Sequence, residues 1–158
     1  MTKIFVFSDS HGEVDAMARL IMSGRPDIVI HLGDLVSDCD ELRRRFPDMQ
    51  IANVRGNCDY RSAVPELLRL NIEGKSIFAA HGHVYNVKSG YTRISYAAME
   101  ADADILLFGH THIAHRDTGR GMEILNPGSI GMGIRPSYGV IKIDGDKAEL
   151  EVVYYEET

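Results

Sequence analysis

The sequence has no tryptophan and only two cysteines, Cys39 and Cys58, in 158 residues. The cysteines do not form a CxxC pair, and in a reducing compartment we expect no disulfide between them. No apolar run approaches the about 18 residues that a membrane-spanning helix requires, and the first residues lack the features of a secretory signal peptide. We therefore expect a cytoplasmic protein that does not enter a membrane.

An excess of positive charge is missing as well. Lys and Arg number 17 against 23 Asp and Glu, which gives a formal net charge of −6. Stable binding to long nucleic acid needs a clustered excess of basic residues, so we expect none. A small phosphate ester stays compatible with this charge. With 44% hydrophobic residues, the length predicts a single domain over residues 1–158.

Apolar runs alternate with helical patterns in the first half of the chain. Runs at 3–8, 27–32 and 49–54 predict strands, and segments 13–24 and 39–46 predict helices. Strands that are apolar on both faces and alternate with helices predict a parallel sheet covered on both sides.

The second half of the chain is richer in hairpin patterns. Residues 67–83 predict two strands joined at 73–75, residues 89–101 a helix, and residues 103–112 a strand followed by a polar loop. Segments 116–129 and 138–155 each predict two strands around a turn that contains glycine. The pattern predicts an α/β layered sheet with β-hairpins added late in the chain.

Polar residues follow five of the predicted strands. In open α/β sheets, ligands gather at the carboxyl ends of strands, so chemistry is expected in these segments. They are Asp9-Ser10-His11-Gly12, Gly33-Asp34, Gly56-Asn57-Cys58-Asp59, His81-Gly82-His83 and Gly109-His110-Thr111-His112.

Taken singly, most of these segments have an ordinary explanation as a capping aspartate, a turn or a loop. Together they supply seven nitrogen and oxygen donors: Asp9, His11, Asp34, Asn57, His81, His110 and His112. This set is too large for one tetrahedral ion, and it suits two first-row divalent ions at about 3.5 to 4 Å. Manganese, iron, zinc, cobalt and nickel all fit such donors, so the residue types do not identify the metal.

The ordered motifs D-x-H, GD, GN, H-G-H and GHTH resemble those of the calcineurin-like metallophosphoesterases. The resemblance runs from Asp9 to His112 and, with the following NPGS, covers most of the chain. The short length, the GNCD spelling and the NPGSIG stretch are most similar to the small YfcE-like phosphodiesterase subfamily. The resemblance implies a two-sheet β-sandwich flanked by helices, in the α/β (α+β) class.

The resemblance also implies a role for each donor. One metal is held by Asp9, His11 and His112, the other by Asn57, His81 and His110, with Asp34 bridging the two. Asp34, Asn57, His81 and His110 are then catalytic, and a water or hydroxide between the metals attacks phosphorus. Manganese is the first choice for both ions.

As a function, the resemblance implies a phosphodiesterase, a phosphoric ester hydrolase, acting on a small phosphodiester. Activated phosphodiesters are favoured over monoesters, and a homodimer or homotetramer is the expected assembly. Two other functions stay open on the same fold: a protein-interaction scaffold without catalysis, and a sensor that binds a phosphate ligand without turnover.

Four further residues are candidates near the substrate. Cys58 stands where well-studied members of the wider family have a histidine, and it is interpreted as a non-catalytic neighbour, a modest acid, or a ligand or nucleophile. Asp59 either orients a neighbouring group or is a solvated turn residue. His83 contacts substrate or belongs to a structural loop, and Asn126 of NPGS is expected to form supporting hydrogen bonds. His31, inside an apolar strand, is expected in the core.

Overall fold

The computed structural model describes residues 1–132 and 134–155. Its strands are β1 (Thr2–Phe7), β2 (Ile28–His31), β3 (Gln50–Asn53), β4 (Leu67–Ile72), β5 (Lys75–Ala80), β6 (Ile105–Phe108), β7 (His115–Gly119), β8 (Met122–Asn126), β9 (Ser137–Asp144) and β10 (Lys147–Tyr154). Its helices are α1 (Val14–Gly24), α2 (Val36–Arg45) and α3 (Thr92–Glu100), with short 3-10 turns at His83–Tyr85 and Val87–Ser89.

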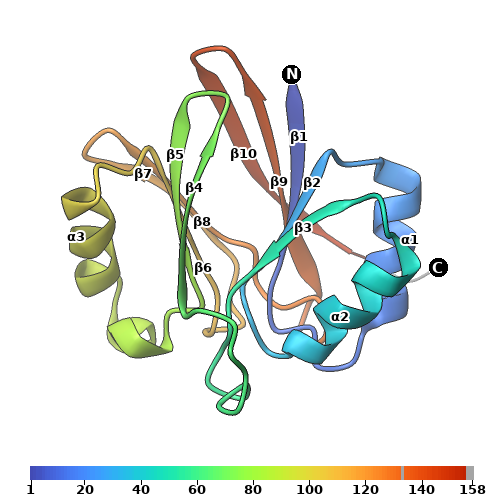
Figure 1. Cartoon of the computed structure of the whole chain (residues 1–158). Coiled ribbons are helices and arrows are strands. Elements are labelled where there is room, and N and C mark those ends of the chain that lie inside the picture. Colours follow the sequence, from blue (N-terminus) through green and yellow to red (C-terminus); the bar gives the residue numbers. More distant parts are fainter. Residues whose placement is uncertain (133, 156–158) are drawn as a thin grey trace.

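The strands form two mixed sheets of five strands each (Figure 1). The first sheet has the order β10-β9-β1-β2-β3, in which β1, β2 and β3 are parallel and the β9–β10 hairpin joins β1 antiparallel. The second sheet has the order β4-β5-β6-β8-β7, with β5, β6 and β8 parallel and an antiparallel strand at each edge. The parallel strands of both sheets end at the same side of the molecule, at the bottom of Figure 1.

Alternation along each strand explains how the two sheets are covered. In β1, Ile4 and Val6 point into a core shared by both sheets, while Phe5 and Phe7 pack against α1. Phe78 of β5 likewise packs toward α3. Figure 1 shows α1 and α2 outside the first sheet and α3 outside the second. The strands are therefore apolar on both faces because one face meets a helix and the other meets the opposite sheet.

The sandwich flanked by helices confirms the fold that the motifs imply, and all the predicted strands and helices are present. The parallel sheet covered on both sides that the periodicity predicts for the first half of the chain is present as β1, β2 and β3, but a second sheet covers one of its faces. The hairpins are not appended to one sheet; they supply antiparallel strands to both sheets. No helix in the described part of the chain has the length and apolar character needed to cross a membrane.

Candidate metal centre

Two buried carboxylates form the centre of the site. Asp9 lies just after β1 and Asp34 just after β2, and the two residues are 0% and 2% exposed. The two loops are joined because Asp9 N donates a hydrogen bond to Gly33 O at 2.9 Å. The parallel pairing of β1 with β2 thus brings the two carboxylates to one point.

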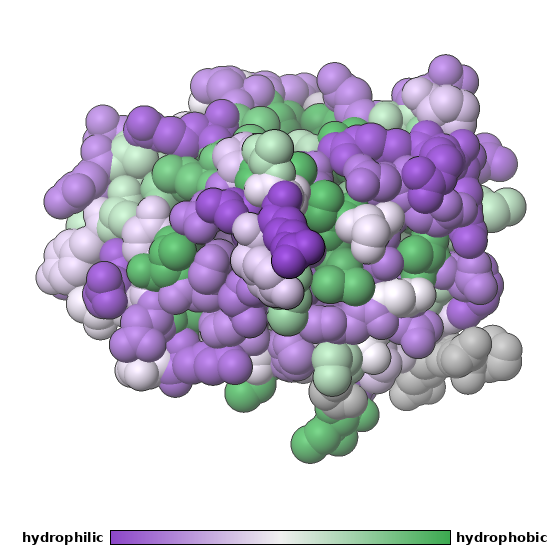
Figure 2. All heavy atoms as spheres, turned by 60° about the horizontal axis from the view of Figure 1, so that its bottom comes forward, coloured by the Kyte–Doolittle hydropathy of each residue, from purple (hydrophilic) through white to green (hydrophobic). Residues whose placement is uncertain are grey.

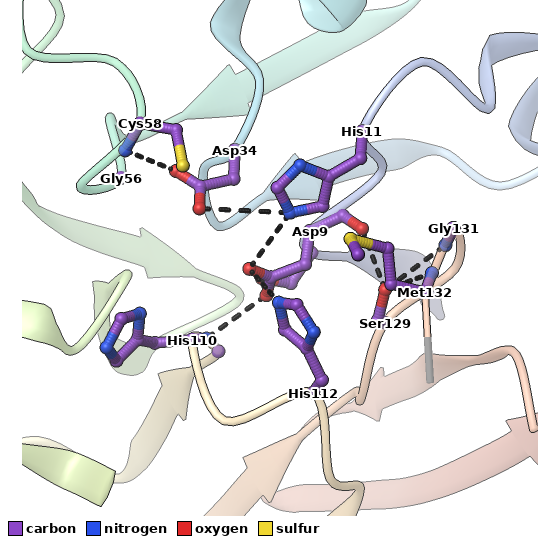
Figure 3. A network of polar contacts seen from close by, with 12 residues as sticks. Asp9, His11, Asp34, Gly56, Cys58, His110, His112, Ser129, Gly131 and Met132 are labelled. Carbon is purple, nitrogen blue, oxygen red and sulfur yellow. Dashed lines mark hydrogen bonds and ion pairs between the residues drawn. The ribbon is translucent and has the colours of Figure 1, made fainter. Parts of the chain in front are cut away.

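Two imidazoles approach Asp9 from opposite sides (Figure 3). His112 Nε2 lies 3.1 Å from Asp9 Oδ1, and His11 Nε2 lies 3.9 Å from the same oxygen. His11 Nε2 is buried without a hydrogen-bond partner in the described residues. The donor atoms of these three residues lie within 4.8 Å of one another, which is the spacing of a metal-binding group.

A second group of donors surrounds His81, a fully buried residue that follows β5. His81 Nδ1 lies 2.7 Å from Leu32 O. A carbonyl oxygen only accepts, so Nδ1 carries the proton and Nε2 presents a lone pair. That Nε2 lies 3.0 Å from Asn57 Oδ1 and 3.1 Å from His110 Nδ1. Three donors that converge on one point in this way fit a cation.

The carboxylate of Asp34 faces both groups. Its Oδ2 lies 3.9 Å from His11 Nε2 and 3.5 Å from His81 Nε2, whereas its Oδ1 accepts a hydrogen bond from Cys58 N at 3.0 Å. One oxygen is thus anchored to the backbone, and the other lies between the two donor groups. This is the position that a bridging ligand requires.

The charge at the centre also fits bound cations. In the described residues, the ion pairs of Asp9 and Asp34 are with histidines, and no lysine or arginine pairs with either. Buried carboxylates without a cationic partner are costly, so such groups are paired or hold metals. Burial and then His81 lower the pKa of His110 to about 4, which keeps its imidazole neutral at pH 7. The donor set therefore suits divalent ions.

Several of the proposed ligands have a strained backbone. Asp9, His11, Asp34, His110 and His112 all have positive φ, between 42° and 71°. Non-glycine residues seldom adopt this left-handed conformation, and where they do, the surrounding structure must hold them there. Five of the seven proposed ligands share it. Strain of this kind typically accompanies a functional site.

A family model of the calcineurin-like phosphoesterase superfamily domain matches residues 2–146. The chain belongs to this superfamily. The match confirms the resemblance of the ordered motifs.

Two relatives show the extent of the similarity. YsnB of Bacillus subtilis, a probable metallophosphoesterase, is 33% identical over 151 residues, which cover 92% of this chain and 86% of that protein. The phosphodiesterase YfcE of Escherichia coli is 27% identical over 174 residues, covering 91% and 89% of the two chains.

Two solved structures are similar in fold. A predicted phosphoesterase from Streptococcus pneumoniae has a TM-score of 0.79 at 30% identity, covering 97% of this chain and 89% of that one. Vps29 of Entamoeba histolytica complexed with Zn²⁺ has a TM-score of 0.76 at 22% identity, covering 96% and 98%. The second likeness shows the fold alone.

In this calcineurin-like phosphoesterase, Asp59 is not a solvated turn residue. Its Oδ2 accepts hydrogen bonds from Asp34 N at 3.0 Å and Gly56 N at 2.8 Å, and its Oδ1 accepts one from Val36 N at 2.9 Å. Asp59 thus orients neighbouring groups, the first alternative that the sequence leaves open. Its bond to Val36 also explains why α2 begins three residues before the predicted helix: the acceptor comes from a distant loop.

Cys58 lies beside the centre, with its side chain exposed. Although the residue is exposed, partial desolvation of its thiol and then a hydrogen bond with Asp34 raise the pKa of Cys58 to about 11. A thiol in this state is neutral at pH 7, which disfavours a thiolate nucleophile. Its backbone N–H also donates a hydrogen bond to Asp34 Oδ1, at 3.0 Å.

His83 and Asn126 have different relations to the centre. The His83 ring lies 5.4 Å from that of His81, and its Nδ1 is buried without a partner in the described residues. Burial lowers the pKa of His83. Asn126 lies behind the GHTH loop, where its Nδ2 donates to Thr111 Oγ1 at 2.9 Å and its Oδ1 accepts from Gly128 N at 2.9 Å. It forms supporting hydrogen bonds and reaches no proposed ligand directly.

Two supports of the site were not selected from the sequence. Ser129 Oγ donates to Asp9 O at 2.8 Å, although only Asn126 of the NPGS loop is a sequence candidate. Beneath the D-x-H loop, Ser10 Oγ contacts His31 Nε2 at 2.8 Å and donates to Asp38 Oδ2 at 2.6 Å. His31 is buried, as expected. Asp38 is spaced like a surface helix residue, so local sequence carries no signal for its role.

Proposed function

We propose that this chain is a phosphodiesterase that hydrolyses small phosphodiesters with two bound divalent cations, manganese being the first choice. The observation that carries the proposal is the position of Asp34 Oδ2, 3.9 Å from His11 Nε2 and 3.5 Å from His81 Nε2. A single carboxylate oxygen facing two donor groups supports two cations rather than one. The phosphodiesterase YfcE among the relatives supports the reaction class.

The residues of the chain have distinct tasks in this proposal. Asp9, His11 and His112 would hold one cation, Asn57, His81 and His110 the other, and Asp34 both. Bound cations supply Lewis acidity toward a phosphoryl oxygen and lower the pKa of water. Asn57 would bind through an amide oxygen without adding negative charge, and imidazole binds a metal as a neutral ligand, so the centre would keep a positive charge for the substrate.

The preference for activated diesters is inferred from Cys58. A neutral thiol at position 58 is a weak proton donor, so leaving groups that need no protonation are favoured.

A protein-interaction scaffold predicts that some metal-binding residues are lost, and a sensor predicts that a phosphate ligand binds without being hydrolysed. Degraded ligand positions would support a scaffold, but all seven donors are present and converge on one centre. The likeness to Vps29 concerns the fold alone and does not favour either function.

The test uses purified protein stripped with a chelator. Bis(4-nitrophenyl) phosphate and 4-nitrophenyl phosphate are assayed after separate addition of Mn²⁺, Ni²⁺, Co²⁺, Zn²⁺ or Fe²⁺. We expect restored hydrolysis, a higher kcat/KM for the diester, and at least about a hundredfold loss in Asp34→Asn. Asp40→Asn, at an exposed position on α2, is the matched control. Failure of every ion to restore hydrolysis of either ester contradicts the proposal.

The assembly also stays a proposal. We expect a homodimer or homotetramer, and light scattering coupled to size-exclusion chromatography measures it directly. A monomer at micromolar concentration contradicts this expectation.

A further inference from the structure

Exposed apolar side chains are frequent at the end of the molecule that carries the metal centre. In the described part of the chain, nine large apolar side chains are exposed, and five of them lie on loops at the carboxyl ends of the strands. These five are Tyr60, Val84, Ile113, Met132 and Ile134. Figure 2 brings this end of the molecule forward and shows apolar side chains interspersed with polar ones and projecting from the lower edge. Such a concentration beside a polar site points to a ligand with an apolar part.

Ile113 is held in place although its side chain is 67% exposed. Its backbone N–H donates to Thr111 Oγ1 at 3.1 Å, and that hydroxyl donates back to Ile113 O at 3.2 Å. Asn126 Nδ2 donates to the same hydroxyl at 2.9 Å. The turn that carries the proposed ligand His112 therefore also fixes the next residue, an exposed isoleucine.

Met132 is held by a similar device. Its backbone N–H donates to Ser129 Oγ at 2.6 Å, and Ser129 Oγ donates to Asp9 O at 2.8 Å. Figure 3 shows Met132 on the Asp9 side of the centre, across from His110. A hydrogen-bonded path thus connects an exposed methionine to the backbone of a proposed ligand.

The side of the centre near His83 carries imidazole and charged groups beside the exposed Val84. His83 lies near His110, with ring centroids 6.2 Å apart, and His83 Nε2 lies 3.9 Å from Glu66 Oε1. The same carboxylate oxygen is 2.9 Å from an Arg55 guanidinium nitrogen. The two sides of the centre therefore offer different surroundings to the two ester groups of a diester.

We propose that Ile113 and Met132 form an apolar subsite that receives an alkyl or aryl group of the substrate. This inference rests on the proposed phosphodiesterase function and narrows it to monoanionic phosphodiesters that carry an apolar organic group. A flexible surface residue would gain little by covering such a group, because ordering it costs conformational entropy. The backbones of Ile113 and Met132 are already fixed by hydrogen bonds, so covering an apolar group costs only the ordering of their side chains.

The test compares two inhibitors that differ only in apolar length, methyl methylphosphonate and hexyl methylphosphonate. Both carry one negative charge and lack an aryl group that would compete for the subsite. Their inhibition constants are measured against bis(4-nitrophenyl) phosphate with the metal-restored protein. We expect the hexyl ester to bind about tenfold more tightly or better, since five added methylenes are partly removed from water.

Variants locate the effect. The double substitution Ile113→Ser with Met132→Gln is expected to reduce the ratio of the two inhibition constants to within about twofold of one. Met22→Gln, at an exposed methionine on α1, is the control and leaves the ratio unchanged. Circular dichroism of each variant verifies folding.

The outcomes separate the two proposals. No metal-dependent hydrolysis of the assay substrate overturns the phosphodiesterase function itself. Hydrolysis with equal binding of the two esters, or a ratio that survives the double substitution, overturns the apolar subsite alone. The subsite is likewise overturned if the double substitution changes the molecular mass of the assembly but not the ratio of the two inhibition constants. The two apolar residues would then belong to an interface between copies of the chain.

Discussion

The carboxylate of Asp59 accepts the backbone N–H of Asp34 at 3.0 Å, although the two residues lie in different loops. The same carboxylate accepts Gly56 N at 2.8 Å and Val36 N at 2.9 Å. One side chain thus joins the GD loop, the GN loop and the start of α2. Asp34 is the proposed bridging ligand. Its position therefore depends on Asp59, in the loop that follows β3.

Asp59→Asn should lower metal affinity by about ten- to a hundredfold, because an amide offers one acceptor in place of two and its NH₂ opposes a backbone N–H. Titration calorimetry with Mn²⁺ on chelator-treated protein measures this. Asp48→Asn, at an exposed position, is the matched control and should bind Mn²⁺ like the unchanged protein. Unaltered affinity in Asp59→Asn would show that the loops hold their positions without it.

Gly56→Ala should abolish metal binding at the second donor group. A Cβ at this position would overlap Asp34 Oδ1 and lie 3.0 Å from His81 Cε1. Both side chains are buried and cannot retreat into solvent. Gly119→Ala is the matched control, because a Cβ there meets only an ordinary contact with Ile124 at 4.0 Å. Metal stoichiometry by mass spectrometry under native conditions distinguishes the two variants, and full occupancy in Gly56→Ala would contradict the close approach.

Cys58→Ser should leave hydrolysis of bis(4-nitrophenyl) phosphate within a few-fold, because the hydrogen bond from its backbone N–H to Asp34, at 3.0 Å, survives the substitution. Cys58→His should raise turnover of less activated esters, since imidazole is the better proton donor. Steady-state kinetics on esters of graded leaving-group pKa measures both effects. A loss in Cys58→Ser comparable with that in Asp34→Asn would assign the sulfur a direct catalytic part.

Acid should destabilise the metal-free protein partly through His31. Burial lowers the pKa of His31 to about 4 from an ordinary 6.5. As the pH falls, the unfolded chain therefore takes up a proton at His31 before the folded chain does. The associated stability is present above pH 6.5 and is lost as the pH falls toward 4, to a total of about 3 kcal/mol.

Urea unfolding at a series of pH values compares the unchanged protein with His31→Gln. The free-energy difference between them at pH 7 should shrink as the pH approaches 4. If the stability of the two proteins depends on pH in the same way over this range, His31 takes up its proton equally in the folded and unfolded states, and the prediction is wrong. His115→Gln, at the start of β7, serves as the control substitution.

The sequence was most informative about the order of the strands and helices and about which residues could bind a cation. The strands, helices and ligand candidates follow from local periodicity and from polar residues after apolar runs, because burial of a strand and the end of a strand are both visible in neighbouring residues. Asp9, Asn57, His81 and His110 are recognisable in this way. Family motifs then assign the donors to groups, and the structure brings these donors together.

Tertiary structure decided how these pieces meet. Periodicity does not distinguish a helix from a second sheet as the cover of an apolar strand face, so the two-sheet packing of Ile4 and Val6 against β5 and β6 is not a local property. The supports provided by Asp59, Ser129 and Asp38 depend on loops that are distant in sequence. By itself the sequence determined which atoms are available to hold a cation. Only the parallel strand ends, meeting at one edge of the sandwich, determined that Asp34 Oδ2 faces both groups.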